Sequence, residues 1–266
     1  MAVETKNIRN VIVVGHSGSG KTSVVEHLLF NGGAIPKAGN VTEGNTISDY
    51  NEDEIERKIS INSSTSYLTY KGVKVNLIDT PGYSDFIGEV FGGLRAADSA
   101  VLIMNAVSGI EIGTERFYKV VKKKQIPFAI FVNRMDKENA DFNKCIEQIT
   151  KKFGKSCACL TYPIGSHSSF KGVANLLTKE GIDKVDAGEQ DNVKALSQSL
   201  TESVAESDDA LLEKYLEEGK LSPEDLNTAF RKAVLSGKVI PVLAGAATAN
   251  MGVKELLDII TGAFPS

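Results

Sequence analysis

The chain has 266 residues, of which 42% are hydrophobic and 24% charged, with only 7 prolines. This length is long for one compact domain and short for two, so we expect a single α/β domain that carries an insertion. The composition can fill a core, which excludes a disordered tail, a collagen and a disulfide-stapled miniprotein. The net charge of −4 argues against a general nucleic-acid-binding protein.

No apolar run approaches the roughly 18 residues that a membrane helix needs, and the start of the chain lacks a signal-peptide core. We therefore expect a cytoplasmic protein with no membrane partner, and a monomer. The cysteines, Cys145, Cys157 and Cys159, are odd in number, and the 3 histidines are scattered. Neither residue type has metal-ligand spacing, so we interpret the cysteines as buried or incidental thiols.

The first elements are a β-branched strand, 10–14, a glycine-rich loop and a helix over 21–31 with apolar residues at helical spacing. A polar segment, 32–64, follows without sustained periodicity. It is too long for an ordinary connection and is therefore expected to be functional or mobile. Two apolar runs, 67–70 and 73–78, then predict a hairpin.

Three further apolar strands are predicted at 100–104, 128–132 and 239–243, with amphipathic stretches of helical length between them and a closing helix over 253–263. Alternation of strand and helix predicts a mostly parallel sheet with helices on both faces. In such a sheet, ligands bind outside the carboxyl ends of the strands.

Residues 163–237 interrupt this alternation. We interpret them as an inserted, α-rich subdomain within a core formed by 1–162 and 238–266. A single helix is expected over 193–218. Residues 179–225 hold 14 acidic and 5 basic side chains, a net charge of −9, so the rest of the chain is net +5. The mildly acidic total therefore hides a basic core and an acidic insert.

The loop between the first strand and helix fits GxxxxGK(S/T), a phosphate-binding loop. Its backbone N–H groups and the helix N-terminus can surround a polyphosphate. Lys21 is predicted to reach the β and γ phosphates and the Thr22 hydroxyl to bind magnesium. A serine-hydrolase elbow is disfavoured because Ser19 stands where that motif needs glycine. The predicted nucleotide-binding residues here are Gly15, His16, Ser17, Gly18, Ser19, Gly20, Lys21 and Thr22.

The tetrapeptide Asp-Thr-Pro-Gly at 79–82 follows an apolar strand. At a strand's carboxyl end Asp79 can hold magnesium, usually through water, and the Gly82 N–H can reach the γ phosphate. A strand-ending turn is the alternative interpretation of the tetrapeptide alone. The phosphate-binding loop upstream favours the interpretation as a magnesium- and phosphate-binding segment.

Asn133, Arg134 and Asp136 follow the strand 128–132 in the pattern NKxD, with arginine for lysine. The Asp136 carboxylate can accept two hydrogen bonds from guanine, from N1–H and the exocyclic amine, a pattern that adenine cannot supply. Arg134 can pack over the base face. A plain loop is the alternative.

These residues together resemble a translational GTPase, and more narrowly the first domain of elongation factor G. The segment 56–61 is similar to the family's ERGITI, and 79–86 is similar to DTPGHVDF. The loop 15–18 and Tyr83 look most like the elongation-factor-G-like branch. Further matches lie at 140–142, 163–165, 170–173 and 241–247. The resemblance to the family's first domain spans the whole chain, and full-length members continue into further domains. We therefore expect this chain to be the leading domain of a longer protein.

The resemblance implies a magnesium-dependent GTPase of the ribosome cycle that binds GTP and GDP. It adds Ser60 to Thr22 and Asp79 as metal-binding residues, and assigns catalysis to Lys21, Gly82 and Tyr83. Ala246 and Ala247 would complete the guanine site, with the Ala247 N–H on the base's O6. The ribosome is the implied partner, and the acidic insert would face the ribosomal stalk protein.

Three residues depart from the family pattern. Ser60 replaces a threonine and lacks the methyl that helps to fix its rotamer, and Ala246 replaces a serine. Tyr83 replaces the histidine that would position the attacking water; a phenol is a poor base at neutral pH but can orient water. Two alternatives therefore stay open: a GTP-dependent binding module without hydrolysis, and, disfavoured by Asp136, an ATP-using P-loop kinase.

Overall fold

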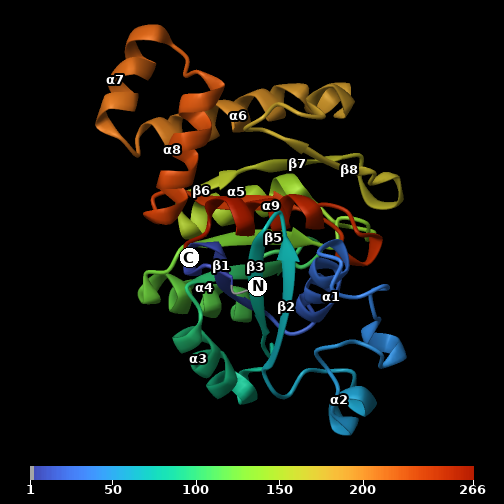
Figure 1. Cartoon of the computed structure of the whole chain (residues 1–266). Helices are drawn as coiled ribbons and strands as arrows, with labels where there is room; N and C mark the ends of the chain where they lie inside the picture. The colour runs from blue at the N-terminus through green and yellow to red at the C-terminus, as the bar shows by residue number, and fades with distance from the viewer. Residues whose placement is uncertain (1–2) are drawn as a thin grey trace.

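A computed structural model describes residues 3–266 and shows a seven-stranded sheet in the order β2-β3-β1-β4-β5-β9-β6 (Figure 1). Only β2 and β3 pair antiparallel; every other pair is parallel. The predicted hairpin and mostly parallel sheet are confirmed. The strands are β1 (Ile8–Gly15), β2 (Ser64–Tyr70), β3 (Val73–Asp79), β4 (Ser99–Asn105), β5 (Phe128–Asn133), β6 (Cys157–Cys159) and β9 (Ile240–Ala244).

The apolar runs become central strands because they can be buried on both faces. In β5 and β9 every residue is buried, whereas the edge strand β2 has one buried residue, Leu68. All three cysteines are buried free thiols, and no cluster of potential metal ligands that includes them forms among residues 3–266.

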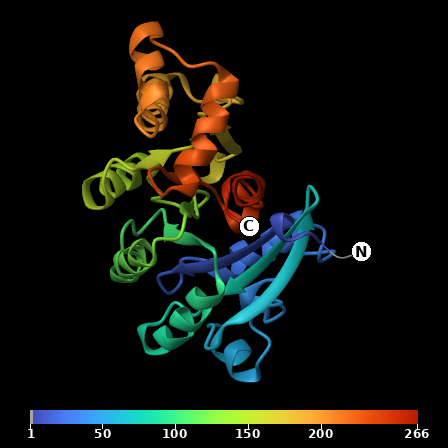
Figure 2. The same cartoon turned by 60° about the vertical axis from the view of Figure 1, so that its left-hand side comes forward.

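Helices cover both faces of the sheet, as predicted. Figure 2 shows α3, α4 and α5 on one face and α9 on the other, where α9 packs against α1. The predicted bounds of the first and last of these helices match the structure. They are α1 (Lys21–Asn31), α3 (Ile87–Ala96), α4 (Ile112–Lys124), α5 (Phe142–Phe153) and α9 (Val253–Ala263).

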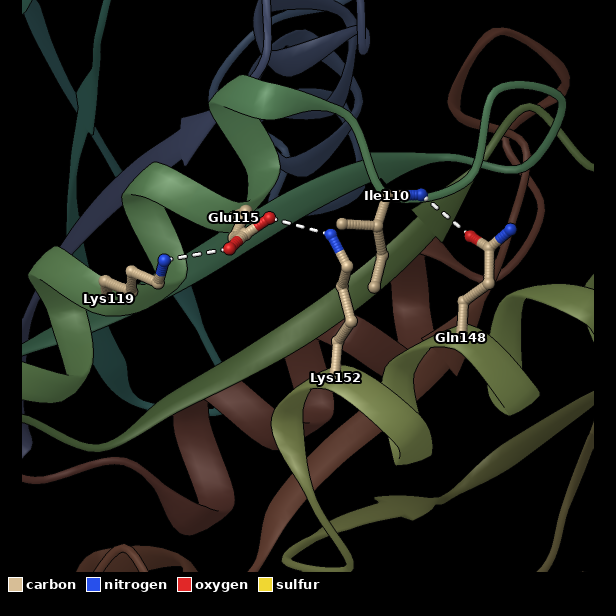
Figure 3. Close-up of polar contacts among 5 residues, drawn as sticks. All are labelled: Ile110, Glu115, Lys119, Gln148 and Lys152. Carbon is tan, nitrogen blue, oxygen red and sulfur yellow. Dashed lines mark hydrogen bonds and ion pairs between the residues drawn. The ribbon is translucent and has the colours of Figure 1, made fainter.

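Helices α4 and α5 are joined by polar contacts (Figure 3). Glu115 of α4 accepts hydrogen bonds from Lys119 at 2.8 Å and from Lys152 of α5 at 2.7 Å, which lowers the pKa of its carboxyl to about 2. Gln148 of α5 accepts the N–H of Ile110 at 2.9 Å. These contacts fix α5 beside α4, and with it the end of the loop that follows β5.

The region 163–237 contains a small sheet and three helices, which gather at one end of the molecule (Figures 1 and 2). The first strand of this sheet starts at Thr161, just before the predicted start of the insert. The division into core and insert stays a prediction. The elements are β7 (Thr161–Ile164), β8 (Gly172–Asn175), α6 (Gln190–Ala205), α7 (Asp209–Glu218) and α8 (Pro223–Leu235).

The single helix expected over 193–218 is wrong, because α6 ends at Ala205 and α7 begins at Asp209. Asp208 caps the second helix by accepting the Leu211 N–H at 3.3 Å. Asp in this position starts a new helix more favourably than it continues an old one. Leu216, which follows the apolar spacing of this stretch, is 74% exposed and so does not belong to a buried face.

The polar segment 32–64 contains one short helix, α2 (Glu52–Arg57), at the edge of the molecule near α1 (Figure 1). Among residues 3–266 no helix has the length and apolar character to cross a bilayer. Short 3₁₀ turns lie at Thr5–Asn7, Val41–Glu43, Ser84–Phe86, His167–Ser169, Ile182–Lys184, Ala187–Glu189 and Ala247–Ala249.

Candidate functional site

The sheet register brings the sequence motifs to one edge. Asp79 pairs with Val13, two residues before the phosphate-binding loop, and Asn133 pairs with Asn105. A cavity of about 370 Å³ opens beside these strand ends. It is lined by Ser17, Gly18, Gly20, Lys21, Thr22, Ser23, Asn40, Val41, Thr42, Asp49, Lys58, Ile59, Ser60, Gly82, Tyr83, Arg134 and Thr248.

Lys21 is buried at the first turn of α1, and its ammonium is held by the loop itself. Its Nζ donates to the carbonyls of Gly15 and His16 at 3.2 Å each. Burial lowers the pKa of Lys21 to about 8, and the charges of Asp79 and Asp49 oppose that shift. A buried ammonium that is bonded only to neutral carbonyls favours an anionic ligand.

Gly20 and Gly82 occupy positions that admit no side chain. Gly20 precedes α1 in the left-handed region (φ +93°), where a Cβ would collide with the Asn133 amide. A Cβ on Gly82 would lie against the Lys21 ammonium and 2.7 Å from Cα of Ser17. The chain after β3 therefore packs against the phosphate-binding loop. Thr80 holds it there by donating to the Val13 carbonyl at 2.7 Å.

Two buried carboxylates face this loop and have oxygens without a hydrogen-bond partner among residues 3–266. Both oxygens of Asp79 and Oδ1 of Asp49 are unpaired, and both residues are at most 5% exposed. Burial raises the pKa of Asp79 to about 6, opposed by the Lys21 charge, and burial also raises the pKa of Asp49. Burial without partners is costly for a carboxylate, so these oxygens are suited to bind a cation or its water.

The hydroxyls of Thr22 and Ser60 lie 3.2 Å apart, although their residues are far apart in the sequence. With Asp79 and Asp49 they form a set of oxygen donors, the type that Mg²⁺ prefers. The predicted residues Thr22, Ser60 and Asp79 thus fit this ion. Asp49 was missed because its polar surroundings in the sequence gave no sign that the fold would bury it.

Asn133 joins the loops at the opposite side of the site. Its Nδ2 donates to the Ser19 carbonyl at 2.9 Å, and its Oδ1 accepts the Ala247 N–H at 3.0 Å. The resemblance assigns this N–H to the base's O6, and in the structure it is donated to Asn133. Thr248, which the sequence analysis did not select, lines the cavity instead. Ala246 is fully buried and pairs with Met251.

Arg134 and Asp136 follow Asn133, and of these two Arg134 lines the cavity whereas Asp136 does not. Arg134 adopts a left-handed backbone (φ +70°) and lines both the main cavity and a neighbouring one of about 160 Å³. Asp136 contacts Lys137 at 2.9 Å through Oδ2, while its buried Oδ1 has no partner among residues 3–266. This orphaned acceptor is suited to a ligand N–H.

His16 and Tyr83 differ in their position relative to the cavity. The His16 ring lies against α4, with Nε2 3.5 Å from Oε1 of Glu111, so only its backbone faces Lys21. Tyr83 lines the cavity and is 44% exposed. Its hydroxyl has no hydrogen-bond partner in the described part of the chain, which leaves it able to contact water or ligand.

Two buried glutamates anchor the polar segment 32–64. Glu26 of α1 accepts the N–H groups of Gly39 and Ile47, and Glu54 of α2 accepts those of Ile61 and Asn62 at 2.9 Å each. Sequence reasoning missed both. A carboxylate among the apolar residues of α1 was the available signal for Glu26, and a capping box with Asn51 the signal for Glu54.

A larger cavity of about 490 Å³ lies elsewhere, between α5 and the region of β7. Its polar groups already satisfy one another: Tyr162 donates to Asn143 at 2.9 Å and also to Glu189, and Asn143 donates to Glu189 at 3.1 Å. A closed network of this kind leaves no orphaned group for a ligand. The cavity at the strand ends is therefore the better candidate site.

A phosphate-binding loop at the end of β1, unpaired carboxylates after β3 and an Asn-Arg-x-Asp loop after β5 define a P-loop nucleotide-binding protein of the GTPase class. A family model described as "Elongation factor Tu GTP binding domain" matches residues 6–266. The chain belongs to this family of GTPase domains.

Relatives and a solved structure agree with this assignment. The elongation factors G of Mycoplasma genitalium and Thermotoga maritima are each 35% identical over 276 residues, which cover 99% of this chain and 40% of theirs. A crystal structure of the Thermus thermophilus protein ttk003000868 superposes with a TM-score of 0.90 at 33% identity. The superposition covers 98% of this chain and 41% of the Thermus thermophilus chain. The chain thus spans well under half the length of these relatives.

Proposed function

We propose that this chain is the magnesium-dependent, GTP-binding and GTP-hydrolysing part of a ribosome-associated translation factor in the cytoplasm. One observation carries the proposal: the fold brings the buried Lys21 and Asp49 into the wall of one cavity, with the unpaired Asp79 and the Asn133–Asp136 loop at the neighbouring strand ends. A magnesium nucleotide would supply an anion to Lys21, a cation to the two carboxylates and N–H groups to the unpaired Oδ1 of Asp136. The match to elongation factors G supports the ribosomal context.

Lys21 and the loop N–H groups would bind the β and γ phosphates, and Thr22, Ser60 and Asp79 would hold Mg²⁺, with Asp49 acting through its waters. A Mg²⁺ ion here neutralises charge on the phosphates. Gly82 lies beside the Lys21 ammonium, and its N–H would bind the γ phosphate. Because Ser60 belongs to the segment 32–64, that segment would respond to the loss of the γ phosphate.

Asp136 would accept two hydrogen bonds from guanine, with Arg134 packed over the base. Asn133 would act indirectly, because its amide ties the phosphate-binding loop to the loop of Ala246 and Ala247. Thr248 and Arg134 line the same cavity, so the base would lie between them. Adenine would be rejected because it leaves the Asp136 oxygens unpaired.

Tyr83 would orient the attacking water through its exposed hydroxyl. Since a phenol is a poor general base, we expect negligible hydrolysis by this chain alone and fast turnover only with the ribosome. Single-turnover GTP hydrolysis by a full-length factor, with and without ribosomes, tests this. Ribosome stimulation that falls on Tyr83→Ala supports the enzyme.

Tyr83 also favours a second function, a GTP-dependent binding module that has lost catalysis. The same experiment separates the two functions. A single-turnover rate that ribosomes do not raise would favour the module, and fast turnover without ribosomes would contradict the expected ribosome dependence.

The acidic insert would bind the ribosomal stalk protein. Helix α7 buries none of its residues, and it presents Leu216 beside Glu213, Glu217 and Glu218 on the surface. An exposed leucine among carboxylates suits a partner with a basic surface and an apolar patch. Salt-sensitive stalk binding supports this role, whereas salt-insensitive binding would contradict the electrostatic account.

A further inference from the structure

Lys58, which follows helix α2, combines an unfavourable backbone with a place in the wall of the candidate site. Its φ is +56°, in the left-handed region that favours glycine, and it lines the same cavity as Lys21 and Gly82. Any L-residue with a Cβ adopts this conformation at a cost in free energy. Lys58 adopts it as the C-cap of α2, where helices commonly end in a left-handed residue.

The surroundings of Lys58 fix its backbone on both sides. The main-chain carbonyl of Glu54 accepts the N–H of Lys58 and, at 3.2 Å, that of Ile59. The buried Glu54 carboxylate then accepts the N–H groups of Ile61 and Asn62 at 2.9 Å each. The turn that carries Lys58 and Ser60 is therefore held as a unit by one glutamate.

The turn reaches the phosphate-binding loop through Ser60, and Lys58 lines the same cavity. Ser60, two residues further, lies 3.2 Å from the Thr22 hydroxyl, and Ile59, Gly82 and Tyr83 line the wall with it. The side chain of Lys58 is exposed, and it has no ion-pair partner within the described residues. An ammonium without a carboxylate partner can serve an anionic ligand instead.

We propose that Lys58 supplies a second ammonium to the terminal phosphate of the nucleotide and so makes the site prefer GTP over GDP. The inference rests on the proposed function. Lys21 and the loop N–H groups would contact the β phosphate, which both nucleotides carry, as well as the γ phosphate. The third phosphate adds negative charge on the side where Lys58 and Ser60 stand, so only GTP gains the added attraction.

Binding titrations of GDP and of a non-hydrolysable GTP analogue, with magnesium, test the proposal on the Lys58→Gln chain. The analogue is expected to bind about tenfold more weakly and GDP less than about twofold more weakly than to the wild-type chain. Raising the salt concentration should shrink the difference between wild type and variant. The Lys58→Arg variant should keep the wild-type preference.

The Lys58→Gly chain separates this role from a merely structural one. Glycine relieves the left-handed backbone, so the melting temperature of the nucleotide-free chain should rise while analogue binding falls as in Lys58→Gln. Lys71→Gly is the matched control. Lys71 also has a left-handed backbone (φ +49°), but it lies in the β2–β3 turn, at the end of β3 opposite Asp79. Its nucleotide binding should match wild type.

Equal weakening of GDP and analogue, or no weakening in either Lys58 variant, would overturn the proposal. These outcomes differ from failure of the proposed function itself, in which the wild-type chain would bind neither guanine nucleotide.

Discussion

Charged residues are placed differently at the candidate-site cavity and in the helical region α6–α8. At the cavity, Lys21, Asp49 and Asp79 are buried, and several of their polar atoms have no partner among residues 3–266. In α6–α8 the carboxylates are at the surface, and those with partners form exposed contacts such as Lys214–Asp225 at 2.7 Å.

This difference indicates where ligand binding should be strongest. Buried charges without partners cost stability in the free chain, and a ligand that pairs them regains that cost on binding. Surface charges are screened by water and salt, so they contribute mainly to the rate and specificity of association. Substitutions in the cavity should therefore have large effects on nucleotide binding. Substitutions in α7 should have small effects, and these should be limited to partner binding.

The largest expected effect is on base specificity. Asp136→Asn replaces an acceptor by an amide that can no longer accept both guanine hydrogen bonds, so the preference for GTP over ATP should fall about a hundredfold. Competition titrations measure this ratio. Xanthosine triphosphate, whose C2 carbonyl can accept from the new amide, should bind the variant better than GTP does. An unchanged preference would remove Asp136 from the base site.

Removing the buried ammonium should weaken binding of every nucleotide. We expect Lys21→Ala to reduce affinity for GTP and GDP about a hundredfold, because a charge buried beside the phosphates is lost. Isothermal titration checks the change. Lys123→Ala, which removes an exposed lysine of α4, is the matched control and should bind like wild type. Similar affinities for both variants would contradict the assigned role of Lys21.

Asp79→Asn should change stability and metal dependence in opposite directions. The nucleotide-free chain should gain about 1 kcal/mol in free energy of unfolding, because a neutral amide is less costly to bury than an unpaired carboxylate. The magnesium enhancement of GTP binding should fall about tenfold. Denaturant unfolding and titration with and without chelator measure the two effects. Asp98→Asn, at an exposed strand start, should show neither.

The smallest expected effect is at α7. Converting Glu213 and Glu217 to glutamine should weaken stalk-protein binding about threefold at low salt and leave GTP binding unchanged. Surface plasmon resonance at two salt concentrations measures this. The exposed Glu147 of α5 provides a control substitution outside the acidic region. A loss of GTP affinity in the α7 variant would contradict the separation between the two regions.

The sequence was sufficient where local pattern decides the structure. The spacing of apolar residues in α1 and α9 predicted their bounds, and because parallel strands end at one edge, Asp79 and Asn133 were expected beside Lys21. The break at Asp208 was missed because the apolar spacing on its two sides is compatible with one continuous helix. A local capping signal overrode that spacing.

Contacts between segments that are distant in the chain could not be predicted from the sequence. The burial of Asp49, the anchoring by Glu26 and the use of the Ala247 N–H by Asn133 depend on how separate loops fold over one another. The left-handed backbone of Lys58 belongs to the same class, because glycine would ordinarily signal such a position. Motifs in the sequence therefore identified the site, but not the contacts between loops that shape it.

The most direct test of the account is a titration of this chain with GTP, GDP and ATP, each with and without magnesium. The account predicts that GTP and GDP bind, that magnesium strengthens GTP binding at least about tenfold, and that ATP binds at least about a hundredfold more weakly. Tight ATP binding with GTP excluded, or guanine-nucleotide binding that magnesium does not affect, would contradict it.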